Sequence, residues 1–264
     1  MLFLRILSYT EQSLNLKIKE SPGTLMKKRK VCVLLILIVV FVLAVGWKRT
    51  DPEVRCTSAR AIAENIAGQG MIRLVEQSVE HPKAALTFDD GPDARYTSVL
   101  LDGLRARNIK VSFFLLGEKV EQNPDLVRRM QEEGHLVGNH TYHHVQLDKL
   151  SDAKAREEIL KTNNLIYETT GRYPQYMRPP FGAWKKNLEL RVEMMPVFWT
   201  IDTLDWKVQN TEQIIKTVEE KVKDGSIILM HDEYKTTVEA ALRLADSLKE
   251  KGYELVTVDE LIMP

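Results

Sequence analysis

The chain has 264 residues, of which 44% are hydrophobic and 28% are charged. This length and composition allow one substantial hydrophobic core or two small ones, and exclude a disordered or fibrous chain. The 37 basic and 37 acidic residues cancel, which argues against a strongly basic nucleic-acid-binding protein. The charge is unevenly distributed, because residues 1–50 hold nine Lys and Arg against two acidic residues and the remainder is therefore acidic.

The basic N-terminal part contains an uncharged apolar run with basic residues on both sides. Four basic residues at 27–30 precede residues 31–47, which carry no charge. As a helix this run is about 25 Å long, against a hydrocarbon core of about 30 Å. The preceding charges predict a cytoplasmic N-terminus and an exported C-terminal part. We expect a transmembrane anchor at 26–49; the alternative is a cleaved signal peptide, since Ala44 and Gly46 are small residues where a signal peptidase acts.

The segments on either side of this run carry weaker signals. Residues 1–25 lack a sustained hydrophobic period, and Met26 begins an export signal of ordinary layout. We therefore expect translation to start at Met26, and residues 50–81 to be a linker before a folded domain at 82–264. The chain's two cysteines, Cys32 and Cys56, both precede that domain. No disulfide can therefore form within it.

From residue 82, short apolar runs alternate with segments of helical period, as in βα units with a parallel sheet. The expected strands are 84–88, 110–116, 136–138, 176–178, 196–201, 226–230 and 253–258. The expected helices are 97–107, 124–133, 151–170, 211–223 and 238–251, with Ser151 as a cap and Gly171 ending the third. Seven strands are somewhat few for an eight-unit barrel, and a doubly wound sheet is the alternative.

Two adjacent carboxylates stand where the first expected strand ends. Asp89 and Asp90 are followed by Gly91, which allows a sharp turn. In both candidate folds the carboxyl ends of the strands carry the functional site. Because neighbouring side chains on a strand point in different directions, one carboxylate can bind a cation while the other acts as a base. Taken alone, the Asp-Asp-Gly-Pro sequence also suits an ordinary turn.

Three histidines lie within five residues after the third expected strand. His140 and His144 can converge on one metal ion if the segment is helical or tightly turned, and His143 is then expected to point elsewhere. Two His and one Asp form a three-ligand set that leaves coordination positions open for water and substrate. A histidine-rich surface loop is the alternative.

Three further motifs begin at later strand ends: Arg178 to Gly182, Asp202 to Trp206, and Leu229 to Asp232. Each by itself suits a turn or a polar strand end. Five such segments at five strand ends together predict one site at one edge of the sheet.

The five motifs are Thr-Phe-Asp-Asp-Gly, His-Thr-x-x-His, Arg-Pro-Pro-Phe-Gly, Asp-x-x-Asp-Trp and Leu-x-His-Asp. In order and spacing they resemble those of the polysaccharide deacetylases with a NodB homology domain, carbohydrate esterase family 4, over about residues 82–260. The resemblance implies a distorted (β/α)7 barrel. It also implies metal-dependent hydrolysis of N-acetyl groups on N-acetylglucosamine-type residues of an extracellular polysaccharide, with release of acetate.

Peptidoglycan is the expected substrate, because an exported domain near a membrane meets cell-wall glycan first. The alternatives are chitooligosaccharide, poly-N-acetylglucosamine, O-acetylated xylan, and a non-catalytic glycan-binding role in the cell envelope. The expected partners are thus the glycan and, through residues 31–47, the membrane, with no nucleic acid.

The resemblance assigns Asp90, His140 and His144 as ligands of one divalent metal ion. Zinc is expected first, with cobalt, manganese, nickel or iron as alternatives. The resemblance also assigns three substrate contacts. These are the backbone N–H of Phe181, where the family usually has Tyr, and an acetyl pocket between Trp206 and Leu229.

The remaining assignments form an acid and a base. The resemblance makes Asp89 the general base with Arg178 as its charge partner, and His231 the general acid with Asp205 orienting it. Because Arg178 is a cation and Asp205 an anion, we expect them to shift the pKa values of base and acid in opposite directions.

Overall fold

The structure is a computed structural model that describes residues 81–184 and 194–263. The predicted segments 1–25 and 26–49, and almost all of 50–81, lie outside the described residues. No helix among the described residues combines the length and apolar character needed to cross a membrane.

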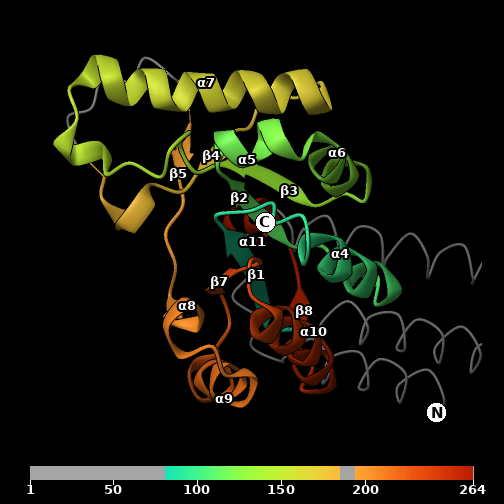
Figure 1. Cartoon of the computed structure of the whole chain (residues 1–264). Helices are drawn as coiled ribbons and strands as arrows, with labels where there is room; N and C mark the ends of the chain where they lie inside the picture. The colour runs from blue at the N-terminus through green and yellow to red at the C-terminus, as the bar shows by residue number, and fades with distance from the viewer. Residues whose placement is uncertain (1–80, 185–193, 264) are drawn as a thin grey trace, which may run out of the picture. The chain divides into compact units, whose positions relative to one another are not determined.

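A parallel sheet forms the centre of the described domain (Figure 1). Its path runs β5-β4-β3-β2-β1-β7-β6, and β8 pairs with the start of β1. The strands are β1 (Lys83–Asp89), β2 (Ser112–Leu115), β3 (Leu136–Asn139), β4 (Tyr176–Met177), β5 (Met195–Pro196), β6 (Ile201–Asp202), β7 (Ser226–His231) and β8 (Glu254–Leu255). Strands β5 and β6 end this path without pairing to each other, so the curled sheet is a distorted, incompletely closed barrel.

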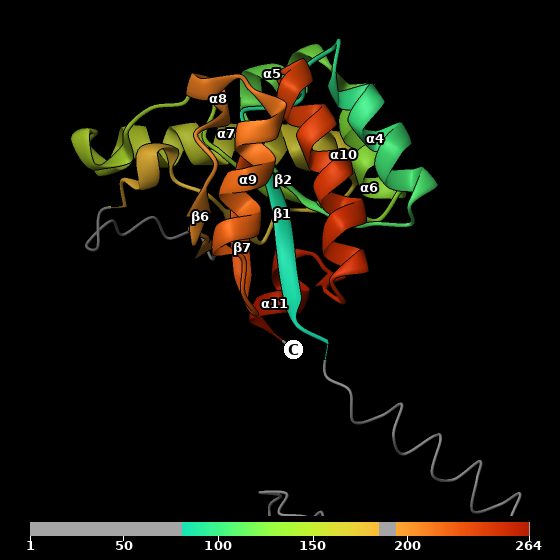
Figure 2. The ribbon, with the colours of Figure 1, turned by 90° about the horizontal axis from the view of Figure 1, so that it is seen from below.

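Helices form an outer layer against the sheet. In it α9 packs on α10, α10 on α4, α4 on α6, and α6 on α7. Figure 1 shows α7 beside α5 and α6, and Figure 2 shows α9, α10 and α4 side by side over β1. The helices are α4 (Thr97–Ala106), α5 (Gly117–Gln122), α6 (Pro124–Glu132), α7 (Asp152–Thr170), α8 (Asp205–Val208), α9 (Thr211–Lys221), α10 (Lys235–Glu250) and α11 (Val258–Ile262).

The two-residue period of β1 separates the outer core from the interior of the barrel. Leu86 and Phe88 are fully buried in the large cluster between the sheet and the helices. Ala85 belongs to a second cluster, with Phe114 of β2. Asp89 lies four residues after Ala85, on the same face of the strand, and is 3% exposed. The same alternation that builds the core therefore points the Asp89 carboxyl group away from the helices and into the barrel.

The predicted α/β architecture is confirmed. All five predicted helices form, and the boundaries of α7 follow the predicted signals. Ser151 accepts a hydrogen bond from the Lys154 backbone N–H, and Gly171 has the left-handed φ of 74°. The helices α5, α8 and α11 were not predicted; they have 4–6 residues each, too few for a helical period to be recognised in the sequence.

The single strand predicted at 196–201 is wrong, because the chain there passes from one end of the sheet path to the other. The Val197 N–H donates to Met177 O of β4, whereas the Thr200 N–H donates to Ile227 O of β7. The segment therefore divides into β5 and β6. Arg178, directly after β4, holds the start of this connection, donating from Nε to Val197 O and from Nη2 to Phe198 O, each at 3.4 Å.

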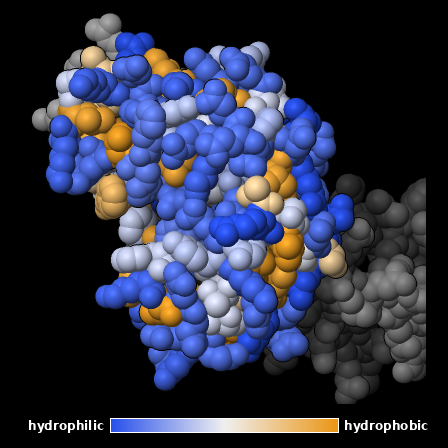
Figure 3. Space-filling view, viewed as in Figure 1, coloured by the Kyte–Doolittle hydropathy of each residue, from blue (hydrophilic) through white to orange (hydrophobic). Residues whose placement is uncertain are grey.

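One face of the domain has few apolar patches. On the face of the described residues shown in Figure 3, hydrophilic residues predominate and hydrophobic residues lie in small separate groups. Such scattered apolar residues are ordinary for a soluble protein surface.

Candidate active site

The site begins where β1 ends. Asp89 is the last residue of the strand, and Asp90 has a left-handed φ of 65° that takes the chain off the strand direction. Oδ2 of Asp89 and Oδ1 of Asp90 consequently lie 3.8 and 3.4 Å from the same atom, Nε2 of His140. The expectation that the neighbouring carboxylates diverge is therefore corrected: the turn at Asp90 brings both to one imidazole.

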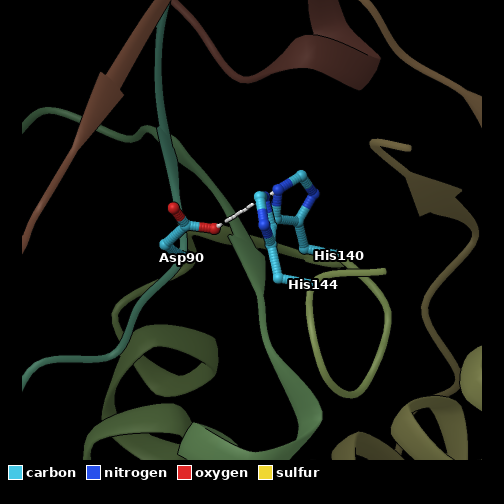
Figure 4. A group of neighbouring side chains, drawn as sticks. All are labelled: Asp90, His140 and His144. Carbon is cyan, nitrogen blue, oxygen red and sulfur yellow. Dashed lines mark ion pairs between the residues drawn. The ribbon is translucent and has the colours of Figure 1, made fainter. Parts of the chain in front are cut away.

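His140 and His144 lie on a tight loop after β3, one of the two backbone geometries the spacing predicted. Thr141 and His144 have left-handed φ values of 68° and 55°. Such values are unfavourable for residues with a side chain and persist where surrounding contacts impose them. Figure 4 shows the Asp90 carboxylate at the end of β1 pointing toward both imidazoles. His143 points away, with its side chain 57% exposed.

Three ligand atoms converge at this point. Asp90 Oδ1 lies 3.4 Å from Nε2 of His140 and 3.4 Å from Nε2 of His144, and all three atoms lie within 4.8 Å of one another. Among the described residues, Asp90 Oδ1 is buried without a hydrogen-bond partner. Ligand atoms about 2.1 Å from a tetrahedral zinc ion are about 3.4 Å apart. The three residues therefore fit a divalent cation.

The protonation of His140 supports the same conclusion. Its Nδ1 lies 2.6 Å from the carbonyl oxygen of Arg178. Because a carbonyl only accepts, Nδ1 carries the hydrogen and Nε2 presents its lone pair to Asp90. Burial, with the nearby charges of His144 and Arg178, lowers the pKa of His140 to about 3 despite Asp90. The imidazole is thus neutral, as a metal ligand must be.

Asp89 and Arg178 form a buried ion pair. Arg178 Nη1 donates to Asp89 Oδ1 at 2.7 Å and to Thr87 Oγ1 at 2.8 Å, and the arginine side chain is fully buried. Burial raises the pKa of Asp89, and the adjacent Arg178 only partly offsets this. Arg178 thus lowers the pKa of Asp89 as expected, but desolvation of the carboxylate outweighs this effect of its cationic neighbour.

Asp205 holds His231 from the opposite side of the site. Its Oδ1 lies 2.8 Å from His231 Nδ1, and its Oδ2 accepts the His231 backbone N–H at 2.7 Å. Burial opposes protonation of the imidazole, but the hydrogen bond and charge of Asp205, with Asp89 and Asp90, raise the pKa of His231 to about 9. The upward direction expected for the acid is confirmed. Nε2 of His231 faces Asp90 Oδ2 at 3.9 Å.

Comparison with known proteins agrees with this geometry. The polysaccharide deacetylase family profile matches residues 76–198. The peptidoglycan-N-acetylglucosamine deacetylase PgdA of Listeria monocytogenes is 43% identical, over 71% of this chain and 40% of the relative. The peptidoglycan-N-acetylmuramic acid deacetylase PdaC of Bacillus subtilis is 38% identical, over 67% of this chain and 38% of the relative.

A solved structure of PdaC from Bacillus subtilis superposes with a TM-score of 0.67 at 37% identity, covering 69% of this chain and 91% of that one. The chain belongs to the polysaccharide deacetylase family. It spans about two fifths of the length of the two curated relatives.

The substrate contacts predicted for this member of the polysaccharide deacetylase family come from segments at the same edge of the sheet. Phe181 is 67% exposed with a left-handed φ of 60°, and its ring lies 4.6 Å from that of His144. Trp206, on α8, is 50% exposed, whereas Leu229, on β7, is buried. Helix α8 packs on β7. The acetyl pocket between Trp206 and Leu229 stays a prediction, as does the role of the Phe181 N–H.

Four supporting residues were not identified from the sequence: Thr87, Asn139, Glu158 and Thr237. Thr87 links Arg178 to Ile228 O, and Thr237 donates to Asp205 Oδ2 at 2.9 Å. Thr87 could have been predicted to face the site, because it lies two residues before Asp89 on the same face of the strand. The other three act through contacts that sequence spacing does not reveal.

Proposed function

We propose that this chain removes N-acetyl groups from N-acetylglucosamine residues of peptidoglycan by metal-assisted amide hydrolysis, releasing acetate. The observation that carries the proposal is the convergence of Asp90, His140 and His144. Beside them, Asp89 Oδ2 lies 3.8 Å from His140 Nε2, and His231 Nε2 lies 3.9 Å from Asp90 Oδ2. The named activities of PgdA and PdaC support peptidoglycan as the substrate.

Asp90, His140 and His144 would hold the cation, and the donor set of two imidazoles and one carboxylate suits zinc. When bound, the cation lowers the pKa of a water molecule and polarises the acetyl carbonyl. Asp89, held by Arg178 at 2.7 Å, takes the proton of the attacking water. The Phe181 backbone N–H would hydrogen-bond to the developing oxyanion.

His231 completes the reaction as the general acid. An amine is a poor leaving group, so its nitrogen must be protonated as the carbon–nitrogen bond breaks. His231 is charged at neutral pH because Asp205 holds its pKa at about 9. The proton on Nε2 passes to the leaving nitrogen. Trp206 and Leu229 would enclose the acetyl methyl group.

Acetate release from purified cell wall, compared with N-acetylglucosamine oligomers and acetylated xylan, tests the substrate. We expect cell wall to be the best substrate and chelator to abolish release. Equal or faster release from the oligomers or xylan contradicts the choice of glycan. Binding of cell wall without acetate release, in metal-loaded protein, would instead establish the non-catalytic envelope role.

We also propose that residues 31–47 anchor the protein in the membrane, with the deacetylase domain on the outer side. The uncharged run and the basic residues before it support this placement. Membrane fractionation and N-terminal sequencing test it. A mature chain that begins at Trp47 contradicts the anchor and establishes the cleaved signal peptide.

A further inference from the structure

The loop between His140 and His144 needs hydrogen-bond acceptors for several successive backbone N–H groups. Its residues 140–143 present four successive backbone N–H groups to the protein interior, and Thr141 and His144 have left-handed φ values. Only two of these N–H groups find partners near the strand. The His140 N–H donates to Leu115 O at 2.9 Å, and the Thr141 N–H donates to Asn139 Oδ1 at 2.6 Å.

A single side chain, that of Glu158, accepts hydrogen bonds from the other two N–H groups. Oε2 of Glu158, on α7, accepts the Tyr142 N–H at 3.0 Å and the His143 N–H at 2.9 Å. Its Oε1 lies 2.7 Å from Nδ1 of His143. The Glu158 side chain is 15% exposed and its bond with the Tyr142 N–H is partly buried, whereas its bonds with His143 lie at the surface. A carboxylate that accepts several N–H bonds makes stronger hydrogen bonds than a neutral acceptor.

The rest of α7 supports the same loop through Asn139. This fully buried side chain donates from Nδ2 to Ile159 O at 2.9 Å and to Asn163 Oδ1 at 2.6 Å. On the opposite side, the Gly117 N–H of α5 donates to Thr141 O at 3.0 Å. The loop is therefore held between two helices, and among the described residues Glu158 is the only side chain that accepts the backbone N–H groups of Tyr142 and His143.

We propose that Glu158 is a positioning residue of the metal centre, holding the loop between His140 and His144 in the conformation in which both imidazoles face Asp90. In the part of the chain that the structure describes, Glu158 hydrogen-bonds to Tyr142 and His143 and to none of the three ligand side chains. It acts through the Tyr142 and His143 backbone, which joins one ligand to the other. Without it, the left-handed residues of the loop would relax and the two imidazoles would separate.

This inference rests on the metal site of the proposed function, so its test measures metal binding without substrate. The probes are Zn²⁺, in competition with a chromogenic chelator, and Co²⁺, whose visible absorption bands report ligand geometry. The full chain is compared with Glu158→Ala, Glu158→Gln and Glu157→Ala. Glu157 is the matched control, because it is the preceding residue of α7 and is exposed.

We expect Glu158→Ala to weaken zinc binding about 10- to 100-fold, the range typical of residues that orient metal ligands, and to alter the cobalt bands. Glu158→Gln should weaken binding less, because its amide oxygen still accepts backbone N–H bonds. Glu157→Ala should bind zinc as the wild type does.

Zinc binding by Glu158→Ala within twofold of Glu157→Ala, with unchanged cobalt bands, overturns the proposal even if the melting temperature of the metal-free protein falls. That result would show that Glu158 stabilises the fold without positioning the metal ligands. If Glu158→Ala does not fold, the same criterion applies to Glu158→Gln. Failure of the wild type to bind either metal overturns the proposed function as well, whereas wild-type binding with unaffected Glu158 variants overturns this inference alone.

Discussion

Asp205 and His231 are joined twice, through the imidazole Nδ1 at 2.8 Å and through the backbone N–H of His231 at 2.7 Å. Asp205 is fully buried and begins the short helix α8, and His231 ends β7. The carboxylate thereby sets both the direction of the ring and the position of the strand end that carries it. This one pairing controls when the proposed general acid is charged.

Substitution of this carboxylate should therefore change the pH dependence of activity. The wild type needs protonated His231, so its activity should fall as the pH rises through about 9. Asp205→Asn removes the charge that raises this pKa, and the alkaline limb should move toward the ordinary value of about 6.5. We expect kcat at pH 7 to fall about 100-fold or more. Initial rates of acetate release from pH 5.5 to 10 check both effects.

Asp202→Asn is the matched control for this experiment. Asp202 lies in the same motif, and its Oδ1 accepts the Leu204 N–H at 2.9 Å, a bond that an amide oxygen can also accept. The alkaline limb of the pH–rate profile of Asp202→Asn should remain at the wild-type position. An unshifted limb in Asp205→Asn would mean that His231 does not set it.

Loss of a metal ligand should appear in binding as well as in activity. Asp90→Asn retains the size of the side chain but replaces a carboxylate by a weaker neutral ligand. We expect zinc affinity to fall more than 100-fold, beyond the range for residues that only orient ligands. Isothermal titration with zinc measures this directly. Asp148→Asn, at an exposed position, should leave affinity unchanged, and equal affinities in the two variants would exclude Asp90 as a ligand.

Arg178 should contribute to stability as much as to catalysis. It is fully buried and donates to Asp89, to Thr87, and to the carbonyl groups of Val197 and Phe198 in the connection after β5. Arg178→Met leaves the Asp89 carboxylate buried without its cation, which costs about 3–5 kcal/mol. Urea unfolding should show this loss in unfolding free energy. The exposed Arg172→Met variant should stay within about 0.5 kcal/mol of wild type.

Gly91 should not tolerate a methyl group. A Cβ added there would lie 2.4 Å from Oδ1 of Asp232, a fully buried carboxyl group that accepts the Thr97 hydroxyl. Gly91→Ala should therefore lower the unfolding free energy by about 1–3 kcal/mol, measured by thermal unfolding. The double variant Gly91→Ala, Asp232→Ala relieves the clash, so the alanine at 91 should cost less in that background. An equal cost in both backgrounds would exclude Asp232 as the source.

The strand and helix periods were sufficient to predict the α/β architecture and the edge of the sheet that carries the site. Asp89, Asp90, His140, Arg178, Asp205 and His231 all lie at or just beyond strand ends. Parallel strands bring their carboxyl ends to one edge whatever the details of packing, so residues far apart in the chain were predicted to meet. The boundaries of α7 were also predicted correctly, because the capping residues Ser151 and Gly171 are local sequence signals.

Three features were decided only by the tertiary structure. The left-handed turn at Asp90 brings both carboxylates to His140, burial outweighs Arg178 in setting the pKa of Asp89, and residues 196–201 pass between β4 and β7 instead of forming one strand. Glu158, on α7 and 15 residues beyond His143 in the chain, hydrogen-bonds to the loop between His140 and His144. Each depends on desolvation or on contacts between separate elements, and neither is encoded in the spacing of residues along the chain. The sequence alone thus determined which residues meet at one edge of the sheet, and the packing determined their geometry and charge.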